Sequence, residues 1–344
     1  MGHNIGQLDI QAGIERAWHG LTRVVEGRAI EMRDAFPYEI ERKPLFVNTG
    51  KFRKVTGFSV FVSNDNGEVI GKPVADTYHA LSNAEFWSVC RDALAGTGAT
   101  IESAGTIFDR ARRFLTIKLG DDATKIGGRE FLSRISMIDS IDGSTRFFMV
   151  NTSVCVVCHN TSRMAMGDMT GEFNVSMKHT KGLGAKINGM ERQIESMLGV
   201  KAQFEAALQM AASEPLTVDN ARPLFAGWLG EGAERLSTQA VNTTDELVAL
   251  YRTGAGNRGE TLLDGVSAVT DFYSHFSSRG EKNEGFKLKQ WTSSEFGAGA
   301  RAKTDFLSAL FVTEKGIVRH VNRDNIATLT RNGARLLADY AAAN

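Results

Sequence analysis

The stretch that most constrains the fold covers residues 131–180, where two apolar runs flank a turn rich in carboxylates and hydroxyls. The runs cover residues 135–138 and 147–150, and Asp139 and Asp142 lie between them. Apolar runs bounded by turn residues are typical of two strands joined by a tight connection. A third strand is expected over residues 173–177. The sequence therefore predicts a sheet whose strand ends carry polar side chains.

Two helices are expected beside this sheet. Ser82 and Glu85 form the pattern of a capping box, which predicts a helix over residues 82–94. Residues 154–166 follow a hydroxyl-rich segment that can cap a helix, and apolar residues recur there at helical spacing. We expect both helices to pack on one face of the sheet.

The order of the remaining elements predicts the fold class. In the first half, five strands are expected, over residues 45–47, 58–62, 68–70, 99–103 and 112–119. A hairpin turn is expected at 64–67. In the second half, helices are expected over residues 190–212, 244–251, 262–276 and 293–311. Strands followed by helices favour an α+β fold, with a mostly antiparallel sheet in the N-terminal half packed with helices and a mainly helical C-terminal half. The predicted domains are an N-terminal anchor segment (1–43), a strand-rich core (44–181) and a mainly helical region packed on the core (182–344).

Several segments match the landmarks of a known family. The segments are residues 139–144, 156–161 and 179–180, together with 17–21, 102–105, 268–275, 296–299 and Lys303. Taken in their order along the chain, these segments resemble the landmarks of the phage/plasmid-like proteins grouped as domain of unknown function 932. Ile141 and His159 stand where that family usually has His and Gln. The resemblance covers most of the chain and implies a phage or plasmid context, but the family name carries no activity.

Composition limits the partners. The chain of 344 residues has 40 basic and 40 acidic residues, so its formal net charge is zero. Nothing in this balance attracts the chain to DNA or to an anionic membrane, and any affinity for a polyanion must come from a local patch. The sequence has no apolar run of 18 residues and no signal-peptide pattern, which favours a cytoplasmic protein without a membrane partner. Its three cysteines suit a reducing compartment.

Two short motifs do not predict a cofactor. Cys155 and Cys158 have the spacing of a haem-attachment or zinc half-site, but two valines separate them, and we expect both to be buried and unbridged. Residues 254–259 fit G-x-G-x-x-G but follow a helix, so they lack the strand-turn-helix setting of a dinucleotide site and are expected to form an interhelix loop. No Walker A motif is present. No cofactor is expected.

One cluster leaves two interpretations open. Asp139, Asp142 and His179 can hold a divalent metal or act as acid and base. Aspartates in a Gly-Ser-Thr turn also bond backbone amides two residues on, and this turn interpretation is favoured. The sequence therefore assigns neither a catalytic residue nor a metal ligand, and it favours a binding protein over an enzyme.

Basic residues on or beside the strand-rich core form the predicted binding site. They are Arg110, Arg112, Arg113, Lys118, Arg146, Lys178, Lys181 and Lys186. Phenylalanines at 108, 114, 147 and 148 are interleaved with them. Basic side chains with aromatic platforms hold single-stranded nucleic acid by charge and stacking. A second basic set is the next candidate: Arg279, Lys282, Lys287, Lys289, Arg301 and Lys303, with Phe286 and Trp291.

The sequence thus predicts a phage- or plasmid-type protein that binds single-stranded DNA as a homo-oligomer and promotes annealing or recombination without ATP. At low resolution the element order also resembles the RecT and lambda Beta class of annealing proteins. Two alternatives stay open. One is a metal-dependent enzyme on nucleotides or nucleic acid that uses Asp139, Asp142 and His179, and the other is an interaction protein that blocks host defence.

Overall fold

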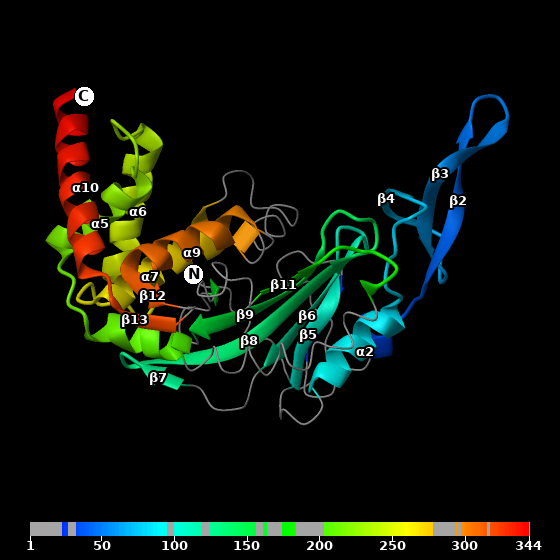
Figure 1. The fold of residues 1–344 in the computed structure, drawn as a ribbon, viewed down its shortest axis with the longest axis horizontal. Helices are drawn as coiled ribbons and strands as arrows, with labels where there is room; N and C mark the ends of the chain where they lie inside the picture. The colour runs from blue at the N-terminus through cyan, green and yellow to red at the C-terminus, as the bar shows by residue number, and fades with distance from the viewer. Residues whose placement is uncertain are drawn as a thin grey trace.

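The computed structural model describes residues 23–26, 32–94, 100–118, 124–155, 161–163, 174–183, 203–277, 293–294, 297–314 and 317–343. In this part of the chain an antiparallel sheet lies between a group of helices at one end and a three-stranded arm at the other (Figure 1). The predicted α+β class is confirmed. None of the described helices combines the length and apolar character that a membrane span requires.

The main sheet is antiparallel in every strand pair that the structure describes. Its path runs through β1 (Arg23–Glu26), β5 (Thr100–Ile107), β6 (Arg112–Lys118), β8 (Arg129–Ser140), β9 (Phe147–Cys155) and β10 (Thr161–Arg163). β7 (Thr124–Ile126) pairs with β8, and β11 (Asn174–Met177) pairs with the first half of β9. The predicted strands on both sides of the 139–145 turn are therefore confirmed.

The arm is a separate three-stranded sheet. It consists of β2 (Ile40–Asn48), β3 (Phe52–Ser63) and β4 (Val69–Ala75), with the predicted 64–67 turn between the last two. Tyr38, Phe61, Ile70 and Val74 form a small core at its base together with Ile141 from the turn after β8. This shared core fixes the base of the arm to the end of the main sheet, while the β2–β3 hairpin projects away from it (Figure 1).

Two helices, α1 (Met32–Ala35) and α2 (Asn83–Leu94), pack beside the main sheet. The predicted capping box begins α2, since the Ser82 amide donates to Glu85 Oε2 at 2.7 Å and the Glu85 amide donates to Ser82 Oγ at 3.0 Å. Phe86 of α2 is fully buried in a core that includes Leu115, Ile135 and Phe147 of three neighbouring strands. Alternate residues of these strands therefore face α2.

The C-terminal half is mainly helical, as predicted. Helical residues 203–213 are followed by α5 (Val218–Leu229), α6 (Thr238–Thr253), α7 (Leu262–Asp271), the π-helix η3 (Phe272–Phe276), α9 (Ala298–Leu310), the hairpin of β12 (Phe311–Glu314) and β13 (Ile317–Val321), and α10 (Arg323–Ala343). α5 and α10 cross closely, because a Cβ on Gly227 would lie 1.9 Å from the Leu329 carbonyl oxygen. Only glycine fits at this crossing.

A buried ion pair joins the helices to the sheet. Arg129, the first residue of β8, bonds Asp264 of α7, and its other terminal nitrogen donates to Ser267 Oγ at 2.6 Å. Asp264 also accepts the amides of Glu260 and Thr261, each at 3.0 Å. Residues 254–259 form the predicted loop between α6 and α7, and they lead into this cap. The G-x-G-x-x-G segment thus belongs to a helix junction.

One predicted helix is wrong. Within residues 154–166, β9 continues to Cys155 and residues 161–163 form β10, which pairs with β9. The hydroxyls of Thr152 and Ser153 lie inside β9, where β-branched and small polar residues are compatible with a strand, so they do not cap a helix. The burial of the three cysteines and the N-terminal segment before residue 23 lie outside what the structure describes.

The Arg129–Asp264 pair gives a stability prediction. Replacing Arg129 by Met should lower the free energy of unfolding by about 3–5 kcal/mol, because it leaves a buried carboxylate without its cation. The matched control is Arg335→Met, which removes one side of the exposed Arg335–Asp339 pair and should cost less than about 1 kcal/mol. Urea unfolding followed by circular dichroism measures both. Equal losses in the two variants would contradict this role for Arg129.

Candidate functional site

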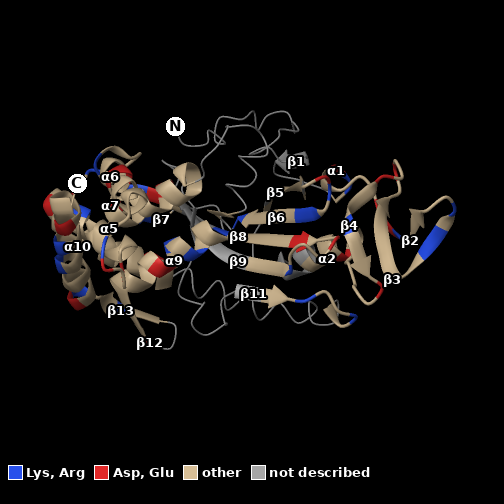
Figure 2. Ribbon diagram, turned by 90° about the horizontal axis from the view of Figure 1, so that it is seen from above, with Lys and Arg blue, Asp and Glu red and all other residues tan. Residues whose placement is uncertain are grey.

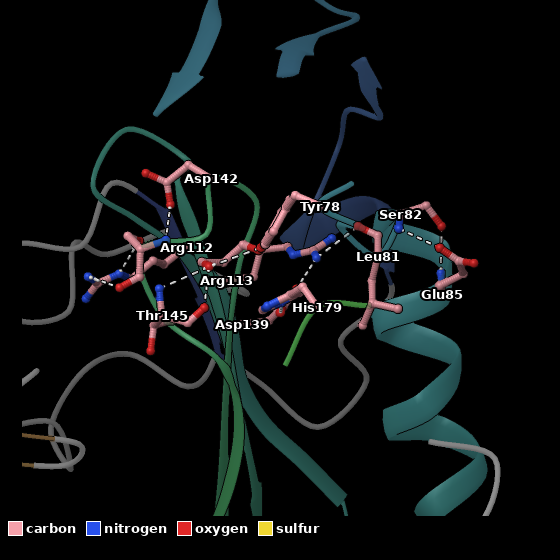
Figure 3. A network of polar contacts seen from close by, with 12 residues as sticks. Tyr78, Leu81, Ser82, Glu85, Arg112, Arg113, Asp139, Asp142, Thr145 and His179 are labelled. Atoms are coloured by element: carbon pink, nitrogen blue, oxygen red, sulfur yellow. Dashed lines mark hydrogen bonds and ion pairs between the residues drawn. The ribbon is translucent and has the colours of Figure 1, made fainter. Parts of the chain in front are cut away.

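A buried network of charges lies where β6, β8 and the segment after β11 meet (Figure 3). Arg113 of β6 is opposite Asp139 of β8 in the strand register, and the two side chains form a fully buried ion pair. The other carboxylate oxygen of Asp139 bonds His179 Nε2. Arg113 also donates to Asn83 Oδ1 at 2.9 Å and to the Leu81 carbonyl at 3.0 Å. The network thus ties two strands to the start of α2.

The environment keeps Asp139 ionised. Burial opposes its ionisation, but the charge of Arg113 and the hydrogen bonds from His179 and Arg113 outweigh this effect and hold the pKa of Asp139 below its usual range. Both oxygens of the carboxylate are engaged by neighbours in the protein. Asp139 is therefore a fixed counter-ion inside the fold.

Tyr78 connects the network to the arm. Its ring lies over that of His179, with centroids 4.9 Å apart, and its hydroxyl donates to the Ser140 carbonyl at 2.6 Å. Burial raises the pKa of the Tyr78 hydroxyl above its usual value. Arg42 of β2 donates to the Tyr78 carbonyl and so links the arm to the same residue. The base of the arm and the charge network are thus parts of one packed unit.

The turn interpretation of Asp142 is confirmed. Asp142 Oδ1 accepts the Ser144 amide at 2.9 Å, and Oδ2 accepts the Lys72 amide at 3.4 Å. The structure brings Asp139 to His179 but leaves Asp142 in the turn. Among the described residues, no three His, Cys, Asp or Glu side chains gather closely enough to hold a metal ion.

The prediction that Arg113 contacts phosphate is corrected. Its side chain has no exposed surface, and its charge is matched by Asp139. In a strand, residues two apart share a face, and Arg113 shares its face with Leu115 and Ile117, which pack in the α2 core. Arg113 therefore faces the interior, and its replacement would destabilise the fold and would not report on a ligand.

Arg110 and Arg112 are held at the turn between β5 and β6. Arg110 Nη1 lies 2.8 Å from Asp65 Oδ1, and its guanidinium lies 4.3 Å from the centre of the Tyr38 ring. Arg112 Nε donates to Ser144 Oγ at 2.9 Å, and its guanidinium lies 4.7 Å from the centre of the Phe108 ring. Phe108 itself is exposed. Arg112 and Phe108 thus pair a cation with an aromatic ring at the surface.

Three more predicted residues emerge at this end of the sheet. Met177 of β11 pairs with Phe147 of β9 in antiparallel register. Lys178, which follows Met177, and Arg146, which precedes Phe147, therefore lie at the same end of the two strands. Both are exposed, as is Lys181. We call Arg112, Arg146, Lys178 and Lys181 the sheet-end rim. The antiparallel pairing gathers residues here that lie as many as 69 positions apart in the sequence (181 minus 112).

Other predicted residues do not join the rim. Lys118 pairs with Arg134 at the opposite end of β6, about 20 Å from Arg112 at the rise of a strand. Lys186 lies outside the described residues. In the second basic set, Lys303 is corrected, because it is buried in α9 and donates to Ser294 Oγ at 2.9 Å. Sequence reasoning missed Lys72, which is exposed in β4 beside Asp142 and could have been found from the polar positions of that strand.

Comparison with known proteins adds a family. A model described as "Domain of unknown function (DUF932)" matches residues 72–322, well over half of the 344 residues. No curated protein and no solved structure matches the chain. The matched range begins within β4, so β2 and β3 of the arm precede it.

The charge network gives a second stability prediction. Asp139→Asn should lower the free energy of unfolding at pH 7 by about 3–5 kcal/mol, because Arg113 loses its buried counter-ion. The single variants Arg113→Met and Asp139→Leu should be destabilised for the same reason, and the variant that combines them should be less unstable than the sum of the two losses. A double-mutant cycle from urea unfolding measures the coupling, and a double variant as unstable as the sum of the single variants would contradict it.

The same pair should respond to acid with a defined sign. Because the folded-state pKa of Asp139 is depressed, its contribution is complete above the unfolded value of about 3.9 and is lost as the pH falls through the lower folded value. The difference in stability between wild type and Asp139→Asn should therefore shrink below about pH 4. Unfolding curves from pH 7 down to pH 3 test this, and a constant difference would count against it.

Proposed function

Because the chain belongs to the family of the domain of unknown function DUF932, whose description names no activity, we propose its function from the exposed charge of the sheet-end rim. The protein binds single-stranded nucleic acid, with DNA as the expected form. The observation that carries this proposal is the position of Arg112, Arg146 and Lys178, which three separate segments bring to one exposed end of the sheet.

The rim has the two components that single-strand binding requires. Cations neutralise phosphates and release condensed counterions, and exposed aromatic faces stack with unpaired bases. Phe108 supplies an exposed ring beside Arg112, while Arg146, Lys178 and Lys181 supply exposed charges. Asp142, the second carboxylate of the 139–145 turn, is buried and accepts two backbone amides. The rim therefore combines exposed cations with an exposed aromatic ring.

The biological setting is also a proposal. The phage/plasmid-like signature that the sequence resembles, and the absence of a Walker A motif, favour a cytoplasmic homo-oligomer that promotes annealing or recombination without ATP. The enzyme alternative gains no support from the site, since Asp139 is already occupied by Arg113 and His179. An interaction protein directed against host defence does not require a rim of exposed cations.

The rim gives a binding prediction. The double variant Arg146→Gln with Lys178→Gln should weaken binding of a fluorescein-labelled single-stranded oligonucleotide about equally for different base sequences, because phosphate contacts do not read bases. The slope of log affinity against log salt should become shallower by about 1.4, at roughly 0.7 for each lost contact. Fluorescence anisotropy titrations between 50 and 200 mM salt, a range in which phosphate contacts change affinity strongly, measure both effects.

The matched control removes the same two charges elsewhere. Lys125→Gln with Arg252→Gln changes one lysine and one arginine that are exposed in β7 and α6. Affinity and slope should stay at the wild-type values in this variant. If wild type fails to bind at about 50 mM salt, where modest phosphate contacts are still effective, the proposed function fails. Equal losses in the two double variants would mean that charge anywhere on the surface suffices and that the rim is not the site.

A further inference from the structure

The free end of the β2–β3 hairpin carries exposed aromatic rings that no core receives. Phe52 is 78% exposed and Phe46 is 50% exposed, although both are phenylalanines in regular strands. The base of the same arm buries Phe61 and Ile70 in the ordinary way. We call residues 46–54 the arm tip. The tip therefore keeps apolar surface in water that the fold itself does not use.

The two rings share one face of the hairpin. Phe46 pairs with Lys54 and Asn48 pairs with Phe52, so all four side chains lie on the same side of the ribbon. Phe46 and Phe52 are diagonal neighbours, with backbone positions about 7–8 Å apart. Val47 and Arg53 occupy the opposite face. One face of the tip is thus a platform of two rings with a lysine at its edge.

The charge at the tip has a single sign. Lys51, Arg53 and Lys54 are exposed, and the sequence from residue 42 to residue 64 contains no Asp or Glu. Figure 2 shows basic positions at this free end of the arm, whereas acidic positions lie nearer its base. In a chain of zero net charge, this concentration is local. Such a surface is complementary to a polyanion.

The tip is also held in a defined shape. Asn48 Oδ1 accepts the Gly50 amide at 3.0 Å, and the Thr49 amide donates to the Lys51 carbonyl at 3.2 Å. Gly50 has a φ of +89°, which glycine adopts without strain. The strands that carry the rings are therefore closed by a turn that the sequence specifies.

We infer that the arm tip is a second contact for single-stranded nucleic acid, in which Phe46 and Phe52 stack on unpaired bases while Lys51, Arg53 and Lys54 neutralise the adjoining phosphates. This inference rests on the proposed function and names the part of the ligand that each side chain recognises. A second copy of the chain is the other occupant to consider, but two tips of like charge repel each other. The tip precedes residues 72–322, the range that matches the family model.

The experiment separates stacking from charge. Wild type, Phe46→Ala with Phe52→Ala (the ring variant), and Lys51→Gln with Arg53→Gln and Lys54→Gln (the charge variant) are titrated by anisotropy against two labelled probes. One probe is a 30-nucleotide deoxythymidine oligonucleotide, and the other is an abasic deoxyribose-phosphate strand of the same length. For each stacked base that it loses, the ring variant should bind the thymidine probe at least about fivefold more weakly than wild type. It should bind the abasic probe as tightly as wild type does, because that probe has no bases to stack. The charge variant should lose affinity for both probes, with a salt slope shallower by about 2.

The controls distinguish this inference from the proposed function. If the ring and charge variants bind both probes as wild type does while the rim variant is weakened, the arm inference is overturned and the proposed function stands. If wild type binds neither probe, both fail. If the ring variant instead changes only the sedimentation of the free protein, the tip is a contact between copies and the inference is wrong. Circular dichroism checks that the variants fold, which is expected because the altered side chains are exposed.

Discussion

A single buried guanidinium, that of Arg113, determines how the sheet, α2 and the arm are arranged. It pairs with Asp139 on the neighbouring strand. It also donates to the Leu81 carbonyl, just before α2, and to Asn83, the first residue of α2. Asn83 in turn donates to the Tyr38 carbonyl at 2.5 Å, beside the core of the arm. A charge in a dry interior is tolerated only when its partners are fixed, so these partners must assemble together. These buried contacts hold the backbone from which the exposed side chains of the rim extend.

A second buried pair has the same role at the other end. Arg129 lies where β8 begins and Asp139 near where it ends, so one strand carries a buried charge at each end of its length. The Asp264 carboxylate that meets Arg129 also closes the capping box of α7 with Thr261. Ile126 and Phe131 of the β7–β8 hairpin join the core of the helices beside this pair. The helical half is thus held to the main sheet by an ion pair and by apolar contacts, and β8 takes part in both.

Local signals were readable from the sequence, and long-range ones were not. The strands around the 139–145 turn and the capping box of Ser82 and Glu85 were predicted correctly, because each depends on residues within a few positions. The burial of Arg113 could have been inferred from its alternation with Leu115 but was outweighed by its charge. The meeting of Asp139 with His179, 40 positions away, depends on the path of β9 and β11 and has no local signature. For the same reason, the hydroxyls of Thr152 and Ser153, which lie in β9, led to the wrong prediction of a helix that begins after them.

Because the chain has equal numbers of basic and acidic residues, its affinity for a polyanion depends on which basic side chains are exposed and not on how many there are. Buried pairs remove Arg113 and Arg129 from contact with any ligand, and Asp65 neutralises much of Arg110. Exposed cations at the sheet-end rim and the arm tip, among them Arg146, Lys178 and Lys51, are the ones that our proposals assign to a polyanion. Gly71 at the arm base would place a Cβ 2.6 Å from Asp142, so the arm rises directly beside the turn that carries the rim. On our two proposals, one strand of nucleic acid would therefore contact both the rim and the arm tip, because the apolar core that Ile141 shares with the arm holds the arm base beside this turn.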